Sequence, residues 1–122
     1  MAKNILILED DKDMQEMYQM FFNDQGDSYK IDIEGKAESA LKRVKEKSYD
    51  LVILDIIMEP LPGDTFFVRL RDEKKTAELP VLVVSVLSQD ALALIKRINH
   101  VSFLQKPVTK EELFTEMDRI LS

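Results

Sequence analysis

Three short, uninterrupted apolar runs constrain the fold of this chain more than any other feature of its sequence. They occupy residues 5–8, 51–54 and 81–84. A strand with one solvated face alternates apolar and polar side chains, whereas a strand of a parallel sheet covered on both faces is apolar at nearly every position. The three runs therefore predict central strands of a parallel sheet with helices on both sides.

Two weaker segments have the pattern of edge strands. Residues 29–33 alternate polar and apolar side chains, and residues 102–105 are short and mixed. Segments with helical periodicity follow the strands, at residues 14–22, 37–44, 66–70, 92–98 and 113–121. Gly26 is a predicted stop for the first of these helices, and Thr109 with Glu112 forms a predicted capping box for the last.

Strand and helix thus alternate five times along 122 residues, without a long linker or a repeat. This alternation predicts a single domain over residues 1–122 of the α/β class. We expect a doubly wound sheet of five parallel strands in the order 2-1-3-4-5, with helices on both faces. In such folds ligands bind beyond the carboxyl ends of the strands, near the point where the strand order reverses.

Composition excludes several classes of function. The chain has no cysteine, so neither a disulfide framework nor a thiolate zinc site can form. Its net charge of −6 argues against direct binding to nucleic acid, which needs basic side chains to neutralise phosphates. No apolar run approaches the roughly 20 residues of a membrane span, and no leader sequence is evident, so we expect a cytoplasmic protein.

The polar residues that end the predicted strands are the main indication of function. They are, in chain order, Glu9-Asp10-Asp11, Asp55, Ser85 and Lys106-Pro107. Because the carboxyl ends of parallel strands lie at one edge of a sheet, we expect these groups to meet there. Two or three carboxylates, a hydroxyl and an ammonium group would then share one pocket.

A pocket of this kind favours a cation and a phosphoryl group. Carboxylates a few ångströms apart repel one another unless a cation lies between them. Oxygen ligands without histidine or cysteine favour a hard ion, and magnesium prefers one or two carboxylates together with water and a phosphate. Beside such an ion Asp55 could act as a nucleophile and form an aspartyl phosphate. Lys106 and Ser85 would then contact the phosphoryl oxygens.

Over nearly its whole length the chain resembles the receiver domain of two-component response regulators. The resemblance rests on Glu9-Asp10, on Asp55 with Gly63 eight residues later, on Ser85 thirty residues after Asp55, and on Lys106-Pro107. It implies a flavodoxin-like fold similar to that of chemotaxis regulators. It also implies that the peptide bond before the proline is commonly cis.

The resemblance implies a role for each of these positions. The metal ligands that it implies are Glu9, Asp10, Asp55 and the backbone carbonyl of Ile57. Ser85 and Lys106 would contact the phosphoryl group carried by the acceptor. Phe103, three residues before the lysine, has the position of the family's aromatic switch and would act together with Ser85.

The implied signalling function needs partners. A sensor histidine kinase or a phosphotransfer protein would donate the phosphoryl group. The face built from the fourth helix, fifth strand and fifth helix would then change its affinity for a downstream protein, and a homodimer is compatible with this scheme. The chain would catalyse only its own phosphorylation and slow dephosphorylation.

Three positions depart from the family's pattern near the site. Glu59 replaces the usual proline, with Pro60 one place later, so the loop would follow another path and bring Glu59 toward the metal. Val86 replaces a small residue and would crowd the mouth of the pocket. Phe103 replaces the usual tyrosine and lacks its hydroxyl hydrogen bond.

Two further departures concern the lifetime of the phosphoryl group. Ile57 and Leu87 occupy the positions where the family places side chains that orient the hydrolytic water. Neither can hydrogen-bond to a water, so we expect slow self-dephosphorylation. The alternative is that Glu59 reaches this water instead.

Structural roles compete with functional ones at several positions. Asp11 or Asp13 would cap the first helix, where an acidic side chain also favours the helix dipole. Phe103 is as well explained by static packing as by a moving switch. His100, the only histidine, is expected to be a surface residue.

Two other functions stay open at this point. A small magnesium-dependent aspartyl-phosphate phosphatase or phosphotransferase would need a second aspartate two residues after the nucleophile, where Ile57 stands. A flavodoxin-like module would need a Ser/Thr/Gly-rich loop for the flavin phosphate after the first strand, and Glu9-Asp10-Asp11 would repel that phosphate.

Overall fold

The computed structural model describes residues 2–55, 63–86 and 100–122. Its strands are β1 (Lys3–Leu8), β2 (Tyr29–Glu34), β3 (Leu51–Leu54), β4 (Val81–Ser85) and β5 (Val101–Gln105). Its helices are α1 (Lys12–Asn23), α2 (Ala37–Glu46), α3 (Gly63–Asp72), the 3₁₀ helix η1 (Lys74–Thr76) and α5 (Lys110–Leu121). The predicted fourth helix, at residues 92–98, lies outside the described residues.

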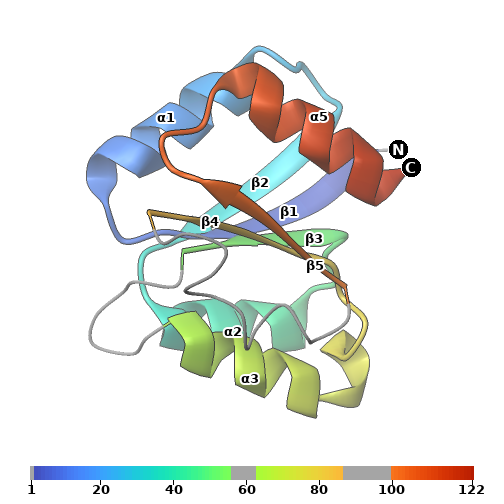
Figure 1. Ribbon diagram of the computed structural model, residues 1–122. Helices are drawn as coiled ribbons and strands as arrows, with labels where there is room; N and C mark the ends of the chain where they lie inside the picture. The colour runs from blue at the N-terminus through green and yellow to red at the C-terminus, as the bar shows by residue number, and fades with distance from the viewer. Residues whose placement is uncertain (1, 56–62, 87–99) are drawn as a thin grey trace.

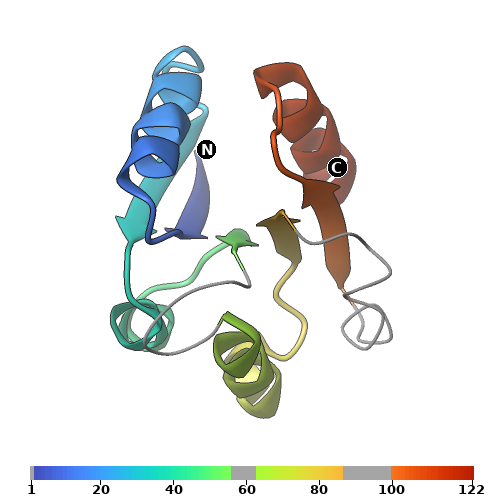
Figure 2. The same cartoon turned by 60° about the vertical axis from the view of Figure 1, so that its left-hand side comes forward.

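The strands form one parallel sheet in the order β2-β1-β3-β4-β5, which confirms the predicted topology. Helices α1 and α5 cover one face, and α2 and α3 cover the other (Figure 1). Figure 2 shows the same two helical layers on either side of the sheet from a second direction. The fold is therefore the expected doubly wound α/β sandwich.

Side chains of the central strands point alternately into two cores. The core facing α2 and α3 includes Leu6, Leu8, Val52, Leu54 and Val83. The core facing α1 and α5 includes Ile5, Ile7, Ile53, Leu82 and Val84. Each of these side chains is at most 1% exposed, so the central strands are buried on both faces, which explains their continuous apolar runs.

The residues at the helix ends have the capping and stop roles that the sequence predicted. The side chain of Asp11 accepts a hydrogen bond from the backbone N–H of Asp13 at 2.9 Å and so caps α1. Thr109 and Glu112 form the predicted capping box at the start of α5. Gly26 follows α1 in the left-handed conformation, with φ of +61°, which glycine adopts without strain.

The outer strand β2 is lined by an ion-pair network. Arg43 of α2 binds Asp32 and Glu34, and Lys47 binds Asp32 at 3.0 Å. The hydroxyl of Tyr49 donates to the same aspartate at 2.7 Å. Burial and this hydrogen bond raise the pKa of Tyr49 to about 12. Arg43 and Lys47 therefore tie α2 and its C-terminal end to the outer edge of the sheet.

The described helices are too short and too polar for a membrane crossing: none has the length and hydropathy that a span requires.

Candidate functional site

Sheet hydrogen bonds place the candidate site residues at one edge of the sheet. Beyond the end of β1 the N–H of Glu9 donates to Glu34 O at 3.0 Å, and beyond β3 the N–H of Asp55 donates to Leu8 O at 3.1 Å. Beyond β5 the N–H of Lys106 donates to Ser85 O at 2.8 Å. These bonds continue the parallel pairing, so the register of the sheet sets the spacing of the site.

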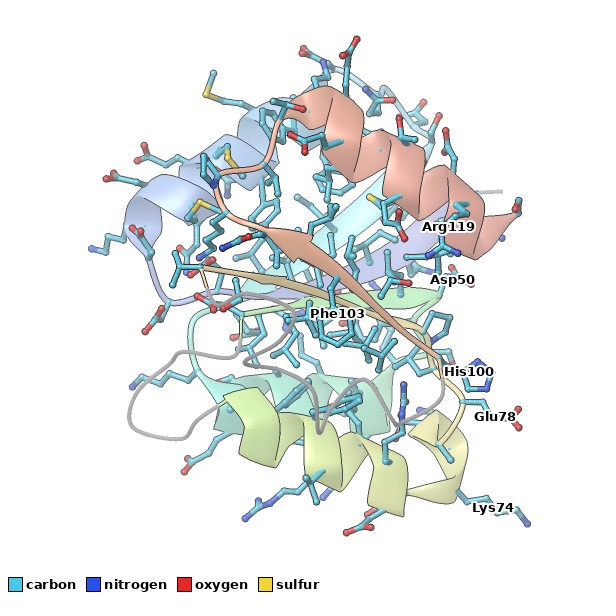
Figure 3. All side chains as sticks on the ribbon, in the orientation of Figure 1. Asp50, Lys74, Glu78, His100, Phe103 and Arg119 are labelled. Carbon is cyan, nitrogen blue, oxygen red and sulfur yellow. The ribbon has the colours of Figure 1, made fainter. Side chains whose placement is uncertain are left out.

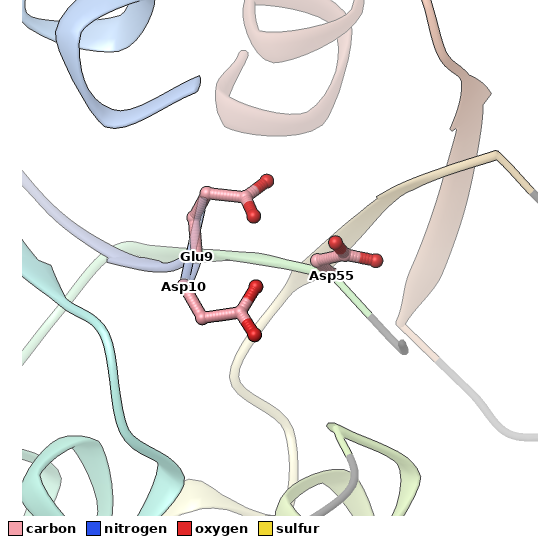
Figure 4. Close-up of side chains that lie close together, drawn as sticks. All are labelled: Glu9, Asp10 and Asp55. Carbon is pink, nitrogen blue, oxygen red and sulfur yellow. The ribbon is translucent and has the colours of Figure 1, made fainter. Parts of the chain in front are cut away.

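Three carboxylates meet at this edge, as predicted. One oxygen from each of Glu9, Asp10 and Asp55 lies within 4.8 Å of the others, and Figure 4 shows the three side chains close together beyond the ends of β1 and β3. Glu9 is 1% exposed and Asp55 is 7% exposed, whereas Asp10 is open to solvent. Two of the three carboxylates are therefore buried, and the third, Asp10, is accessible from solvent.

Lys106 completes the group from the end of β5. Its Nζ lies 2.8 Å from Glu9 Oε1 and 3.0 Å from Asp55 Oδ2. Burial alone would lower the pKa of Lys106, but its hydrogen bonds to the two carboxylates outweigh this and hold the pKa above its ordinary value. The lysine is thus a fixed positive charge between the two buried acids. The peptide bond from Lys106 to Pro107 is cis, as the resemblance implied.

The described part of the site carries more acidic than basic side chains. Burial raises the pKa of Glu9 above its ordinary value, although Lys106 and the backbone N–H of Asp11 oppose the rise. Among the residues that the structure describes, three carboxylates meet beside the ammonium group of Lys106, and their charged oxygen atoms can only accept hydrogen bonds. A hard divalent cation with oxygen ligands fits this donor set and this charge.

Ser85 lies at the end of β4, the strand between β3 and β5. Its side chain is buried, and the next residue, Val86, is 58% exposed. The carbonyl of Val86 accepts a hydrogen bond from Gln105 Nε2 at 3.2 Å, which joins the ends of β4 and β5 beside the site. The register thus brings Ser85 to the same edge as Asp55 and Lys106.

Phe103 lies in the middle of β5 and points away from the α1 and α5 layer (Figure 3). It is partly buried and packs against the core that faces α2 and α3. This placement agrees with a packing role in this conformation, and the switch role stays a prediction. His100 lies with Asp50 and Glu78 at the opposite edge of the sheet, far from the carboxylates (Figure 3).

Other predicted site residues fall outside the part of the chain that the structure describes. They are Ile57, Glu59, Pro60 and Leu87. The backbone metal ligand, the loop path beyond the acceptor and the water-positioning argument therefore stay predictions.

One contact at the site was not predicted from the sequence. The side chain of Gln15, in the first turns of α1, donates to the backbone carbonyl of Glu9 at 2.6 Å. The residue carries no charge and belongs to no motif, so the sequence offered no signal for it.

The family model of the response regulator receiver domain matches residues 5–118. This chain belongs to that family. A receiver domain is a module of two-component signalling rather than an enzyme acting on external substrates. The match therefore gives no support to the phosphatase alternative.

Among curated relatives, the response regulator ArlR of Staphylococcus haemolyticus is 28% identical over 120 residues. The match covers 97% of this chain and 52% of that protein, so the chain spans about half the length of this relative. A sensor histidine kinase of Ectopseudomonas mendocina, TmoS, is 27% identical over 120 residues, and the match covers 97% of this chain and 12% of that protein. Receiver-like segments thus occur in proteins of different overall architecture.

A solved structure of the receiver domain of a sensor histidine kinase from Pseudomonas aeruginosa has a TM-score of 0.87 and 17% identity. The alignment covers 99% of this chain and 98% of that one. That structure holds a magnesium ion coordinated in its active-site cleft. At this identity the likeness shows the fold alone.

Proposed function

We propose that this chain is the phosphoacceptor of a two-component phosphorelay and that Asp55 carries the phosphoryl group. The observation that supports this most strongly is the meeting of Glu9, Asp10 and Asp55 at the carboxyl edge of the sheet, with Lys106 bound to Asp55 Oδ2. The donor would be a sensor histidine kinase or a phosphotransfer protein, and the reaction would take place in the cytoplasm.

In the proposed reaction an oxygen of Asp55 attacks the phosphorus atom, and the bond from phosphorus to the imidazole nitrogen of the donor breaks. The leaving imidazole takes up a proton. Magnesium held by Glu9, Asp10, Asp55 and the carbonyl of Ile57 would offset the negative charge of the phosphoryl group. Lys106 would exchange its bond to Asp55 for one to a phosphoryl oxygen, since its three N–H donors suit either acceptor.

The proposed output is a change of partner affinity. Ser85 lies one strand away from Asp55, and its hydroxyl would follow the phosphoryl oxygens. Phe103, in the neighbouring strand, would respond to that movement and alter the face formed by the fourth helix, β5 and α5. A downstream protein or a second copy of the chain would bind this face, and we propose no direct contact with nucleic acid.

We expect the phosphoryl group on Asp55 to be lost slowly. The aliphatic side chains of Ile57 and Leu87 cannot form a hydrogen bond to an attacking water. Positioned acid–base assistance is commonly worth on the order of 10²-fold, so loss should be roughly ten- to a hundredfold slower than with polar side chains at both positions. If Glu59 orients the water instead, decay will be fast, and Glu59→Ala will slow it.

The test is phosphorylation by a small-molecule donor. The wild-type chain, incubated with acetyl phosphate and magnesium, should gain one phosphoryl group in its intact mass. Asp55→Asn should gain none. Asp11→Asn removes the same charge from the same acidic region and keeps the helix cap, so it should behave as wild type. Phosphorylation of Asp55→Asn at the wild-type rate would overturn the proposal.

A further inference from the structure

The carbonyl of Glu9 has an unusual partner. Glu9 lies just beyond β1 and is 1% exposed, so both of its backbone polar groups need partners inside the protein. Its N–H donates to Glu34 O, which continues the sheet. Its carbonyl oxygen accepts the Gln15 side chain instead, with Nε2 at 2.6 Å.

Gln15 reaches this carbonyl because of its place on α1. Asp11 is the N-cap of the helix, and helical side chains lean toward the helix N-terminus. The amide of Gln15 therefore points back over the first turn, toward the peptide that joins Glu9 to Asp10. A carbonyl oxygen can only accept, so the amide must present its NH₂ group.

Space for the amide is provided by a glycine from another segment. An ideal Cβ at Gly35, directly after β2, would lie 3.4 Å from Gln15 Nε2 and 3.8 Å from Glu9 O. A side chain larger than a methyl group would have to share the volume that the amide occupies. Gly35 does not have a left-handed backbone that would itself require glycine. A β-carbon at this position would therefore only touch the hydrogen-bonded pair, so the segment after β2 packs directly beside it.

We infer that Gln15 is a positioning residue for the metal site: its hydrogen bond fixes the Glu9–Asp10 peptide and so aims the Asp10 carboxylate at Asp55. A peptide unit is planar, so holding the Glu9 carbonyl sets the direction in which Asp10 leaves the strand. Asp10 is exposed and receives little restraint from packing. Without the Gln15 hydrogen bond, the Asp10 carboxylate would become ordered only when the cation binds, and this ordering would weaken binding.

This inference rests on the proposed magnesium site and deepens it. Groups that orient metal ligands commonly contribute 10- to 100-fold to metal affinity. We expect Gln15→Met, which keeps the length of the side chain and removes the donor, to weaken magnesium binding about tenfold. Gln19→Met, one turn later on α1 at an exposed position, is the matched control and should bind as wild type.

The test uses two readouts on the folded protein. Calorimetric titration with magnesium gives the affinity, and amide hydrogen exchange in chelator follows the N–H of Asp11, which donates to Glu9 Oε2. Gln15→Met should weaken magnesium binding and speed the exchange of this N–H. Wild-type affinity in Gln15→Met, even with lowered stability, would overturn the inference. Absence of magnesium binding in the wild type would instead contradict the proposed function.

Discussion

Replacing Lys106 by methionine should destabilise the folded protein, because it removes the positive charge between two buried carboxylates. Methionine keeps most of the packing of the lysine stem but removes the charge that lies 2.8 Å from Glu9 and 3.0 Å from Asp55. The side chains of Lys106, Glu9 and Asp55 are only 13%, 1% and 9% exposed, so water can replace the ammonium group only in part. Removing one partner from a buried ion pair commonly costs about 3–5 kcal/mol.

Protonation sets an upper limit on this loss. A carboxyl group can take up a proton instead of staying charged, and near pH 7.5 this costs about 4 kcal/mol for an unfolded-state pKa of about 4.3. We therefore expect Lys106→Met to lower the free energy of unfolding by about 2–4 kcal/mol without magnesium. Near pH 5 the same proton costs only about 1 kcal/mol, so most of the loss should disappear.

The sign of this pH dependence follows from the pKa of Glu9. Burial already raises this pKa in the folded protein, and removing Lys106 removes a group that lowers it. A group whose folded-state pKa is raised stabilises the fold below its unfolded-state pKa and loses that contribution as the pH rises. The variant should therefore become less stable than wild type between about pH 4.3 and neutrality.

Urea denaturation in chelator, at several pH values, measures the loss. Lys110→Met is the matched control, because Lys110 pairs with Asp24 on the surface and such pairs contribute at most about 1 kcal/mol. Magnesium should recover part of the stability of Lys106→Met by mass action. A loss below about 1 kcal/mol, or a loss independent of pH, would refute the electrostatic account.

Further predictions concern the metal, the lifetime, a helix cap and a tyrosine. Millimolar magnesium should raise the melting temperature of the wild type, and Asp10→Ala should largely abolish the rise; equal responses would count against this ligand. Ile57→Asn should speed decay of the phosphoryl group roughly tenfold or more, measured by intact mass over time, and unchanged decay would remove the water-positioning argument. Thr109→Ala should cost about 1 kcal/mol in urea denaturation through the lost cap, while Thr109→Ser should cost little. Tyr49 should ionise near pH 12 because of burial and its bond to Asp32, so the tyrosinate absorbance of wild type minus Tyr49→Phe should appear there and not near pH 10.

Much of the fold was predictable because its signals are local. Continuous apolar runs indicate strands that are buried on both faces, and the helices between them predict parallel pairing. The polar ends of those strands then had to meet, and Glu9, Asp10, Asp55 and Lys106 do so.

Contacts that depend on side-chain direction were not predictable. The bond between Lys106 and Glu9 joins residues 97 positions apart, and from the sequence we expected this lysine to contact phosphoryl oxygens alone. The contact of Gln15 with Glu9 was not predicted, because a single uncharged amide belongs to no recognisable sequence motif. The face on which Phe103 packs depends on its register with Val83, and the short, mixed β5 does not encode that register.

The most direct measurement of the central claim is the position of the phosphoryl group in the chain. Wild-type protein would be phosphorylated with acetyl phosphate in magnesium and in chelator, reduced with borohydride to trap the acyl phosphate, and mapped by peptide mass spectrometry. The account predicts one modified residue, Asp55, in the magnesium sample alone. Modification of another aspartate, or equal modification of Asp55 in chelator, would contradict it.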